Sequence, residues 1–245
     1  ARCGPHPLRL IRSERRLPRP QAANAGIEVA AREADWITLL DDDEFLPQQV
    51  TTLQEALRSE PEARLAHGQS LEVDAEGASL QVYGSAFIPW KQLDCGFFQL
   101  GACVFSSALV REGARFDENL DILEDLEFFV QCAQRTRFVF VPKVVSRYHV
   151  MSGDSGAGLG PNLDPARIRK ALGYIRVKWH ELAARLERLP QARLERAQDA
   201  WKAGRADEAY SLLRELALER PDDSNLRLAL GRVEQVLRTR RDQST

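Results

Sequence analysis

The chain has 245 residues, enough for one large domain or for one domain with a smaller appendage. Its apolar content of 44%, charged content of 29% and formal net charge of −2 are those of an ordinary globular protein, so we expect no nucleic-acid partner. No apolar run reaches membrane-spanning length, and the four cysteines form no CxxC pair. This favours free thiols in a cytoplasmic protein, with peripheral attachment at the inner face of the membrane as the alternative.

Hydrophobic periodicity and proline punctuation predict an alternation of helices and strands that is typical of an α/β fold. We expect the strand at 36–40 to be buried in a parallel sheet, because its residues are almost all apolar. The predicted elements in chain order are a strand at 8–12, a helix at 21–34, the strand at 36–40, a helix at 47–59, a β-hairpin within 64–88, a strand and short helix at 101–110, an amphipathic helix at 122–135, and strands at 138–141 and 144–148.

Four acidic residues follow the predicted strand at 36–40 directly; they are Asp41, Asp42, Asp43 and Glu44. Clustered carboxylates raise one another's pKa unless a cation compensates, and Mg²⁺ or Mn²⁺ prefers oxygen ligands. Ligands of open α/β sheets bind beyond the carboxyl ends of strands, so the cluster predicts a metal site that would hold an anionic group such as a nucleotide diphosphate. The alternative is that the acids cap the following helix, a role that explains one or two of them more easily than four.

A second acidic pair, Glu124 and Asp125, opens the predicted helix at 122–135. A helix N-terminus stabilises an ionised carboxylate and so keeps it available as a proton acceptor. A metal at the first cluster and a base at the second predict attack of a hydroxyl on a carbon whose leaving group is a metal-bound phosphate. For an isolated pair, capping of the helix is the alternative.

Two ring-bearing residues in loops are further candidates. Trp90 lies in an aromatic loop at 89–101, where the ring would either stack on a sugar or pack in the core. His149 ends a predicted strand and precedes a glycine- and serine-rich segment at 151–165, which we expect to be an active-site lid. The His149 imidazole would join the metal shell or contact a phosphate, with a structural role as the alternative.

The order of these motifs resembles that of the family 2 glycosyltransferases of GT-A fold, which show an Arg-Asn-x-Gly-Ile segment, a strand ending in an Asp-x-Asp motif, a Glu-Asp pair and a closing Tyr-x-x-His. The matching segments are 21–27, 36–43, 45–47, 116–118 with 124–125, and 147–149 with Ser152 and Ser155. The resemblance covers about residues 8–155. It also leads us to expect that the family's initial strand–helix–strand, which carries part of the nucleotide pocket, precedes the first residue given.

The resemblance implies a Rossmann-like GT-A domain that acts as an inverting, metal-dependent glycosyltransferase. A sugar would move from a nucleotide-diphosphate donor to a hydroxyl of a carbohydrate or glycoconjugate acceptor, in polysaccharide or glycoconjugate biosynthesis. The residues that we assign on this basis are Asp125 as catalytic base, Glu124 and Trp90 on the acceptor side, Asn24, Asp41 and Asp42 for donor binding, and Asp41, Asp43 and His149 for a divalent metal, Mn²⁺ or Mg²⁺.

Two departures from the family pattern keep other functions open. Ala23 and Gln131 stand where the family usually has arginine. The second hypothesis is therefore a catalytically inactive GT-A-like domain that acts as a protein-interaction module through a helical tail. A nucleotidyltransferase is a third, although the glycine-rich, basic phosphate loop typical of that class is not visible.

Composition predicts a boundary between two domains, at 1–160 and 161–245. Alanine, leucine, arginine and glutamate dominate the second, which we expect to be all-helical. From about residue 190 its spacing resembles a tetratricopeptide repeat, with a plain helical hairpin as the alternative. One and a half repeats do not form a solenoid alone, so the tail is expected to pack on the first domain, pair with a second copy or bind another protein.

Overall fold

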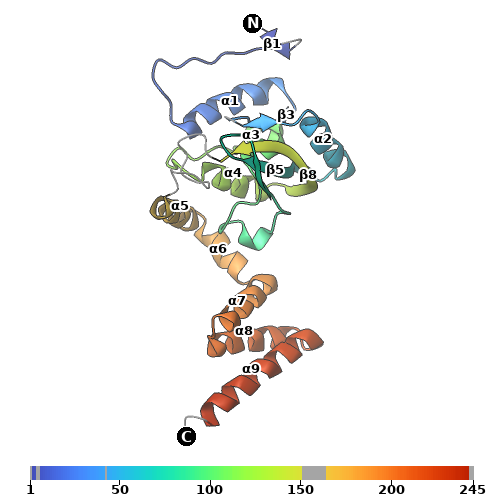
Figure 1. Cartoon of the computed structure of the whole chain (residues 1–245), viewed down its shortest axis with the longest axis vertical. Coiled ribbons are helices and arrows are strands. Elements are labelled where there is room, and N and C mark those ends of the chain that lie inside the picture. Colours follow the sequence, from blue (N-terminus) through green and yellow to red (C-terminus); the bar gives the residue numbers. More distant parts are fainter. Residues whose placement is uncertain (1, 4–5, 42, 151–163, 243–245) are drawn as a thin grey trace. The chain divides into compact units, whose positions relative to one another are not determined.

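The computed structural model describes residues 2–3, 6–41, 43–150 and 164–242. The chain divides into two compact units, Ala1–Lys178 and Trp179–Thr245. The first unit is mixed α/β and the second is helical, which confirms the predicted α/β fold with a helical C-terminal part (Figure 1). The helix at Pro165–Lys178 belongs to the first unit, so the division between the units falls later than the predicted boundary.

Five helices belong to the first unit as the structure describes it. Proline and apolar spacing explain the longest, because Pro20 suits a first turn and Ile27 and Ala31 share its buried side. The helices are α1 (Arg19–Glu33), α2 (Gln49–Ser59), α3 (Ser107–Arg111), α4 (Glu124–Ala133) and α5 (Pro165–Lys178), with 3₁₀ turns at Pro89–Lys91 and Leu100–Ala102.

One mixed sheet carries the fold, in the strand order β3-β7-β5-β8-β4, with β6 paired to β5. The two long strands β5 and β8 run parallel, and the other pairings in this sheet are antiparallel. The strands are β3 (Trp36–Ile37), β4 (Glu44–Phe45), β5 (Ala63–Val73), β6 (Ser79–Tyr83), β7 (Cys103–Ser106) and β8 (Arg137–His149), and a separate pair joins β1 (Arg2–Cys3) to β2 (His6–Pro7).

Three strand predictions are wrong. Residues 8–12 form no strand. The strand at 36–40 shortens to β3, an edge strand antiparallel to β7, since Leu40 is exposed and Thr38 Oγ1 donates a hydrogen bond to the Cys103 carbonyl. The two strands around Pro142 are one strand, β8, because a register shift against β5 lets an exposed proline pass without breaking the pairing.

Apolar side chains cover both faces of the sheet. Helices α1, α3 and α4 share one core with Phe105 of β7, while α2 shares another with Val104 of the same strand. Successive residues of a strand point to opposite faces, which places these helices on opposite sides of the sheet. The predicted hairpin is confirmed as β5 and β6.

The second unit contains four helices within the residues described. Helices α7, α8 and α9 share one apolar core, and Gly204 makes the turn between α7 and α8 with a φ of 76°. These helices fit the predicted helical tail, and their likeness to a tetratricopeptide repeat stays a prediction. The helices are α6 (His180–Glu187), α7 (Pro190–Lys202), α8 (Ala206–Glu219) and α9 (Ser224–Asp242).

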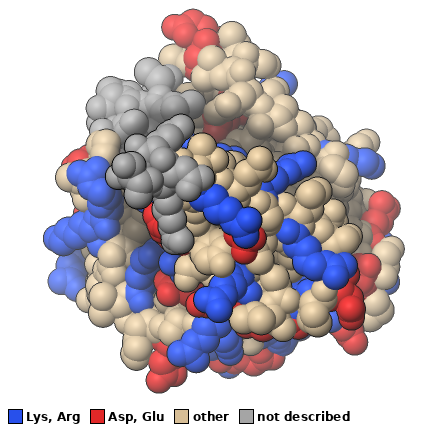
Figure 2. Space-filling view, turned by 90° about the horizontal axis from the view of Figure 1, so that it is seen from below, with Lys and Arg blue, Asp and Glu red and all other residues tan. Residues whose placement is uncertain are grey.

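Acidic and basic side chains are interspersed over the face drawn in Figure 2. Among the described residues, no helix combines the length and the apolar character needed to cross a membrane.

His67 is a buried polar residue in the middle of β5. Its ring is 0% exposed and stacks on Phe98, with ring centroids 3.9 Å apart. Neither ring nitrogen has a hydrogen-bond partner in the described part of the chain. Burial lowers the pKa of His67 to about 3, so the folded protein holds a neutral imidazole.

This burial predicts a pH-dependent free energy of unfolding. Below the ordinary histidine pKa the unfolded chain binds a proton that the folded chain does not, so His67 costs stability as the pH falls toward about 3. Urea titrations of the wild type and of His67→Phe should diverge by about 2–3 kcal/mol between about pH 7.5 and about pH 4.5, with the variant favoured at the lower pH. A difference between the two proteins that does not change with pH would contradict this.

Candidate functional site

The acidic cluster lies between β3 and β4, beside the end of β8. The backbone N–H of His149 donates a hydrogen bond of 3.1 Å to Asp43 Oδ1. The His149 ring points to Glu44 instead, with Nε2 3.2 Å from Oε1. The main chain of His149 is therefore bonded to Asp43, and the role of both residues in a metal site stays a prediction.

The donor chemistry of this cluster fits a hard divalent cation, because Asp41 and Asp43 offer carboxylate oxygens. Asp41 is exposed and Asp43 half-buried, and Gly101 lies alongside, where an added Cβ would be 3.9 Å from Asp43 Oδ2. No group of three His, Cys, Asp or Glu side chains placed to hold a metal occurs among the residues described. Asp42 lies outside those residues, and the metal stays a prediction.

The second acidic pair forms the first turn of α4. Asp125 Oδ1 accepts a hydrogen bond of 2.8 Å from the Leu126 N–H, and Arg19 Nη2 lies 3.1 Å from Glu124 Oε1. Burial raises the pKa of both carboxyls, and the charge of Asp125 raises that of Glu124 further, while Arg19 opposes the rise in both. A base with a raised pKa accepts a proton more readily once it is ionised.

The acidic cluster after β3 and the second acidic pair, at the start of α4, influence one another electrostatically. The charge of Asp41 contributes to the raised pKa of Glu124, after burial and the charge of Asp125. Burial, and then the charge of Asp125, raises the pKa of Tyr83 at the end of β6 to about 12. Asp41 is thus linked electrostatically to Glu124, and Asp125 to both Glu124 and Tyr83, although these residues are far apart in sequence.

Asn24 is buried and committed to the fold. Its Nδ2 donates hydrogen bonds to the Phe116 carbonyl and to Glu118 Oε1, and its Oδ1 accepts one from the Phe116 N–H. These bonds tie α1 to the loop that precedes α4. The donor-binding role of Asn24 stays a prediction, as does the acceptor-side role of Trp90, which lies half-buried in the turn Pro89–Lys91.

No family model and no curated protein sequence matches the chain. Two crystal structures of S. aureus TarS resemble it at 12% sequence identity. For TarS 1-349 the TM-score is 0.46, over 65% of this chain and 44% of that one. For the other TarS structure it is 0.49, over 82% of this chain and 37% of that one. The chain spans less than half the length of either, and the function proposed below rests on its own residues.

Sequence reasoning did not identify the two cations that hold the acids around α4. Arg19 lies in a Pro-Arg-Pro segment, which by its composition indicates only a basic loop. Lys178 lies in the region that composition places in the helical tail. Lys178 Nζ is 2.6 Å from Asp117 Oδ2 and 2.8 Å from Glu127 Oε1. Burial opposes ionisation of Asp117, but hydrogen bonds from Lys178 and Asn119 lower its pKa to about 2. The sequence spacing of these residues gives no signal for this contact.

Lys178 compensates a carboxylate that has no exposure to water. The Glu127 side chain is 0% exposed, whereas that of Lys178 is 35% exposed. The substitution Lys178→Met should lower the free energy of unfolding by about 2 kcal/mol. This loss is smaller than that expected for a fully buried ion pair, because Lys178 is partly solvated. Adding Glu127→Gln to the variant should recover part of the loss, since the fully buried charge is then removed while Asp117, the other carboxylate paired with Lys178, stays charged.

Urea unfolding followed by circular dichroism measures these changes, and Lys170→Met is the matched control on the exposed side of the same helix. Equal effects of the two lysine substitutions, or no recovery in the double variant, would show that Lys178 does not compensate Glu127.

Proposed function

We propose that the chain is a glycosyltransferase domain that moves a sugar from a nucleotide-diphosphate donor to an acceptor hydroxyl with inversion, in polysaccharide or glycoconjugate biosynthesis. The observation that supports this most is that the charge of Asp41, in the segment after β3, contributes to the raised pKa of Glu124 at the start of α4. In such a site, the acidic cluster after β3 would face the donor and the second acidic pair would face the acceptor. The motif order that resembles family 2 glycosyltransferases agrees with this division.

In the proposed reaction, Asp125 removes the proton of the acceptor hydroxyl as its oxygen attacks the anomeric carbon of the donor. The bond from that carbon to the nucleotide diphosphate breaks in the same step, so the configuration inverts and no covalent enzyme intermediate forms. Glu124 and Trp90 would orient the acceptor. Asn24, Asp41 and Asp42 would contact the donor.

A divalent ion, Mn²⁺ or Mg²⁺, is part of the proposal. Asp41 and Asp43 would hold it, with His149 at the edge of the same site. When bound, such an ion neutralises charge on the departing diphosphate. The chain's own contribution is to supply carboxylate oxygens in the segment between β3 and β4, where Asp43 lies beside Gly101.

The base assignment predicts separable effects on binding and turnover. Asp125→Asn should lower the rate of sugar transfer by about 10²–10⁴-fold, because a general base contributes about that factor. The affinity for the nucleotide sugar should stay unchanged, since Asp125 is assigned to the acceptor. Isothermal titration with a panel of nucleotide sugars, together with product analysis, measures both quantities. Loss of donor binding in the variant would contradict the base role, and no binding by the wild type would contradict the function.

The metal assignment predicts a loss of metal dependence. In Asp43→Ala, the affinity for a nucleoside diphosphate measured with Mn²⁺ should fall to the value that the wild type shows in EDTA. Asp35→Ala, which removes an exposed carboxylate just before β3 instead of after it, is the control and should keep the Mn²⁺ effect. A full Mn²⁺ effect in Asp43→Ala would remove Asp43 from the proposed metal site.

One observation favours the second hypothesis, a domain that has lost donor binding and acts as an interaction module. The amide of Asn24 is already engaged by Phe116 and Glu118, so a donor contact would require those bonds to change. The titration above separates the hypotheses, because the module would bind no nucleotide sugar.

A further inference from the structure

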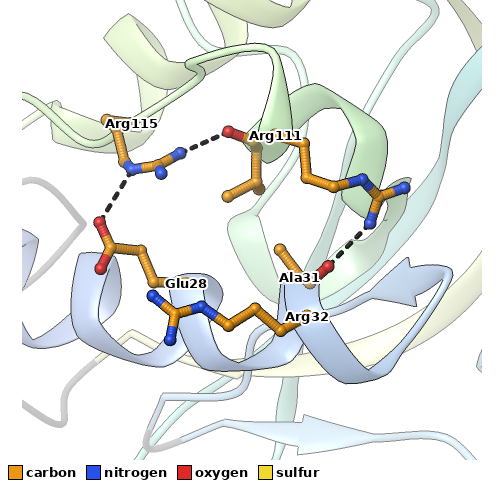
Figure 3. Close-up of a pocket in the computed structure, with 6 residues that line it drawn as sticks. Glu28, Ala31, Arg32, Arg111 and Arg115 are labelled. Atoms are coloured by element: carbon orange, nitrogen blue, oxygen red, sulfur yellow. Dashed lines mark hydrogen bonds and ion pairs between the residues drawn. The ribbon is translucent and has the colours of Figure 1, made fainter.

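A recess lies between α1 and α3, with a volume of about 470 Å³ (Figure 3). Helix α1 ends just before β3 begins at Trp36, and α3 begins just after Ser106, the residue paired with Trp36. The recess is therefore at the start of β3, whereas the acidic cluster follows its end. Its lining residues are Glu28, Ala31, Arg32, Val110, Arg111 and Arg115.

Backbone oxygens hold two of the three arginines in place. Arg111 Nη1 donates hydrogen bonds of 2.7 Å to the Ala31 carbonyl and to Ser107 Oγ. Arg115 Nη1 donates to the carbonyls of Val110 and Ala114, and its Nε donates to Glu28 Oε1 at 3.3 Å. None of these bonds uses Nη2 of either arginine. Both guanidinium groups are thus oriented by the fold and retain N–H donors for a ligand.

Arg32 differs from the other two arginines. It is exposed in the last turn of α1, and its side chain makes no hydrogen bond or ion pair with any residue that the structure describes. Figure 3 shows its side chain running along α1 between Ala31 and Glu28, at the border of the recess. Hydrogen bonds to carbonyls in the last turns of α1 and α3 give Arg111 and Arg115 a structural role, but such a role gives no account of Arg32.

The charges around the recess do not cancel. Three guanidinium groups face one carboxylate, that of Glu28, so the lining carries a net charge of three minus one, or +2. A ligand with two negative charges would balance it. Guanidinium forks match phosphate oxygens in a bidentate manner, and the recess is large enough for a phosphate monoester or a diphosphate.

We propose that Arg32, Arg111 and Arg115 form a binding site for a soluble phosphate monoester or diphosphate, separate from the candidate active site. The ligand would contact the guanidinium groups directly, without a metal ion. Ala31 and Val110 provide the apolar wall. Glu28 opposes binding, because its carboxylate repels the ligand and holds Arg115 Nε.

Inorganic pyrophosphate is the probe, titrated calorimetrically into the whole chain at low ionic strength with EDTA present. Without a divalent ion the acidic cluster repels pyrophosphate, so binding reports on the arginine recess. Arg32→Gln should weaken binding roughly tenfold, as expected for the loss of one charge-assisted contact. Glu28→Gln should tighten binding about threefold, because it removes a repelling charge.

Arg58→Gln is the matched control, since Arg58 is an exposed arginine in the last turn of α2 and its loss changes the net charge equally. It should leave the affinity unchanged. The proposal is overturned if the wild type binds no pyrophosphate, if Arg32→Gln and Arg58→Gln weaken binding equally, or if Glu28→Gln weakens it. All three variants alter exposed side chains, so unfolding would not obscure the result.

Discussion

The first turn of α4 concentrates negative charge that the rest of the first unit must compensate. Glu124, Asp125 and Glu127 lie within four consecutive residues, and Glu127 has no exposure to water. The helix N-terminus offsets part of the repulsion, and Arg19 and Lys178 offset more. These cations come from the helices α1 and α5. Helix α4, which carries the candidate base, is therefore tied to two elements remote from it in sequence.

The backbone just before these acids is strained. Leu123 has a φ of 60°, in the left-handed region that a leucine rarely adopts. Two arginines help to stabilise this strained backbone. The carbonyl of Asp121 accepts hydrogen bonds from both Arg19 and Arg167. The loop is thus fixed on one side by cations and on the other by α4. Strain of about 1–3 kcal/mol that persists beside a candidate base is the pattern of a preorganised site.

Local patterns allowed most helices, the hairpin and the α/β class to be predicted, because periodicity and proline act over a few residues. Partner strands and counterions do not follow from local patterns. An apolar run such as Trp36 to Leu40 fits a central parallel strand, yet its pairing with β7 places it at an edge. Likewise, helical spacing indicated α5 but not that Lys178 would reach Glu127. The acids of the candidate site were proposed from sequence, whereas the cations paired with them were not.

The two ends of β3 offer unlike means of holding a phosphate. Carboxylates follow its end, so a phosphate there requires a bridging cation to overcome repulsion. Guanidinium groups surround its start, where a phosphate would bind without one. Chelation of divalent ions should therefore weaken phosphate binding at the acids, through repulsion, and leave phosphate binding at the arginines unchanged. The fold thus places acidic and basic groups after the end and around the start of one short strand, so the two proposed sites differ in charge.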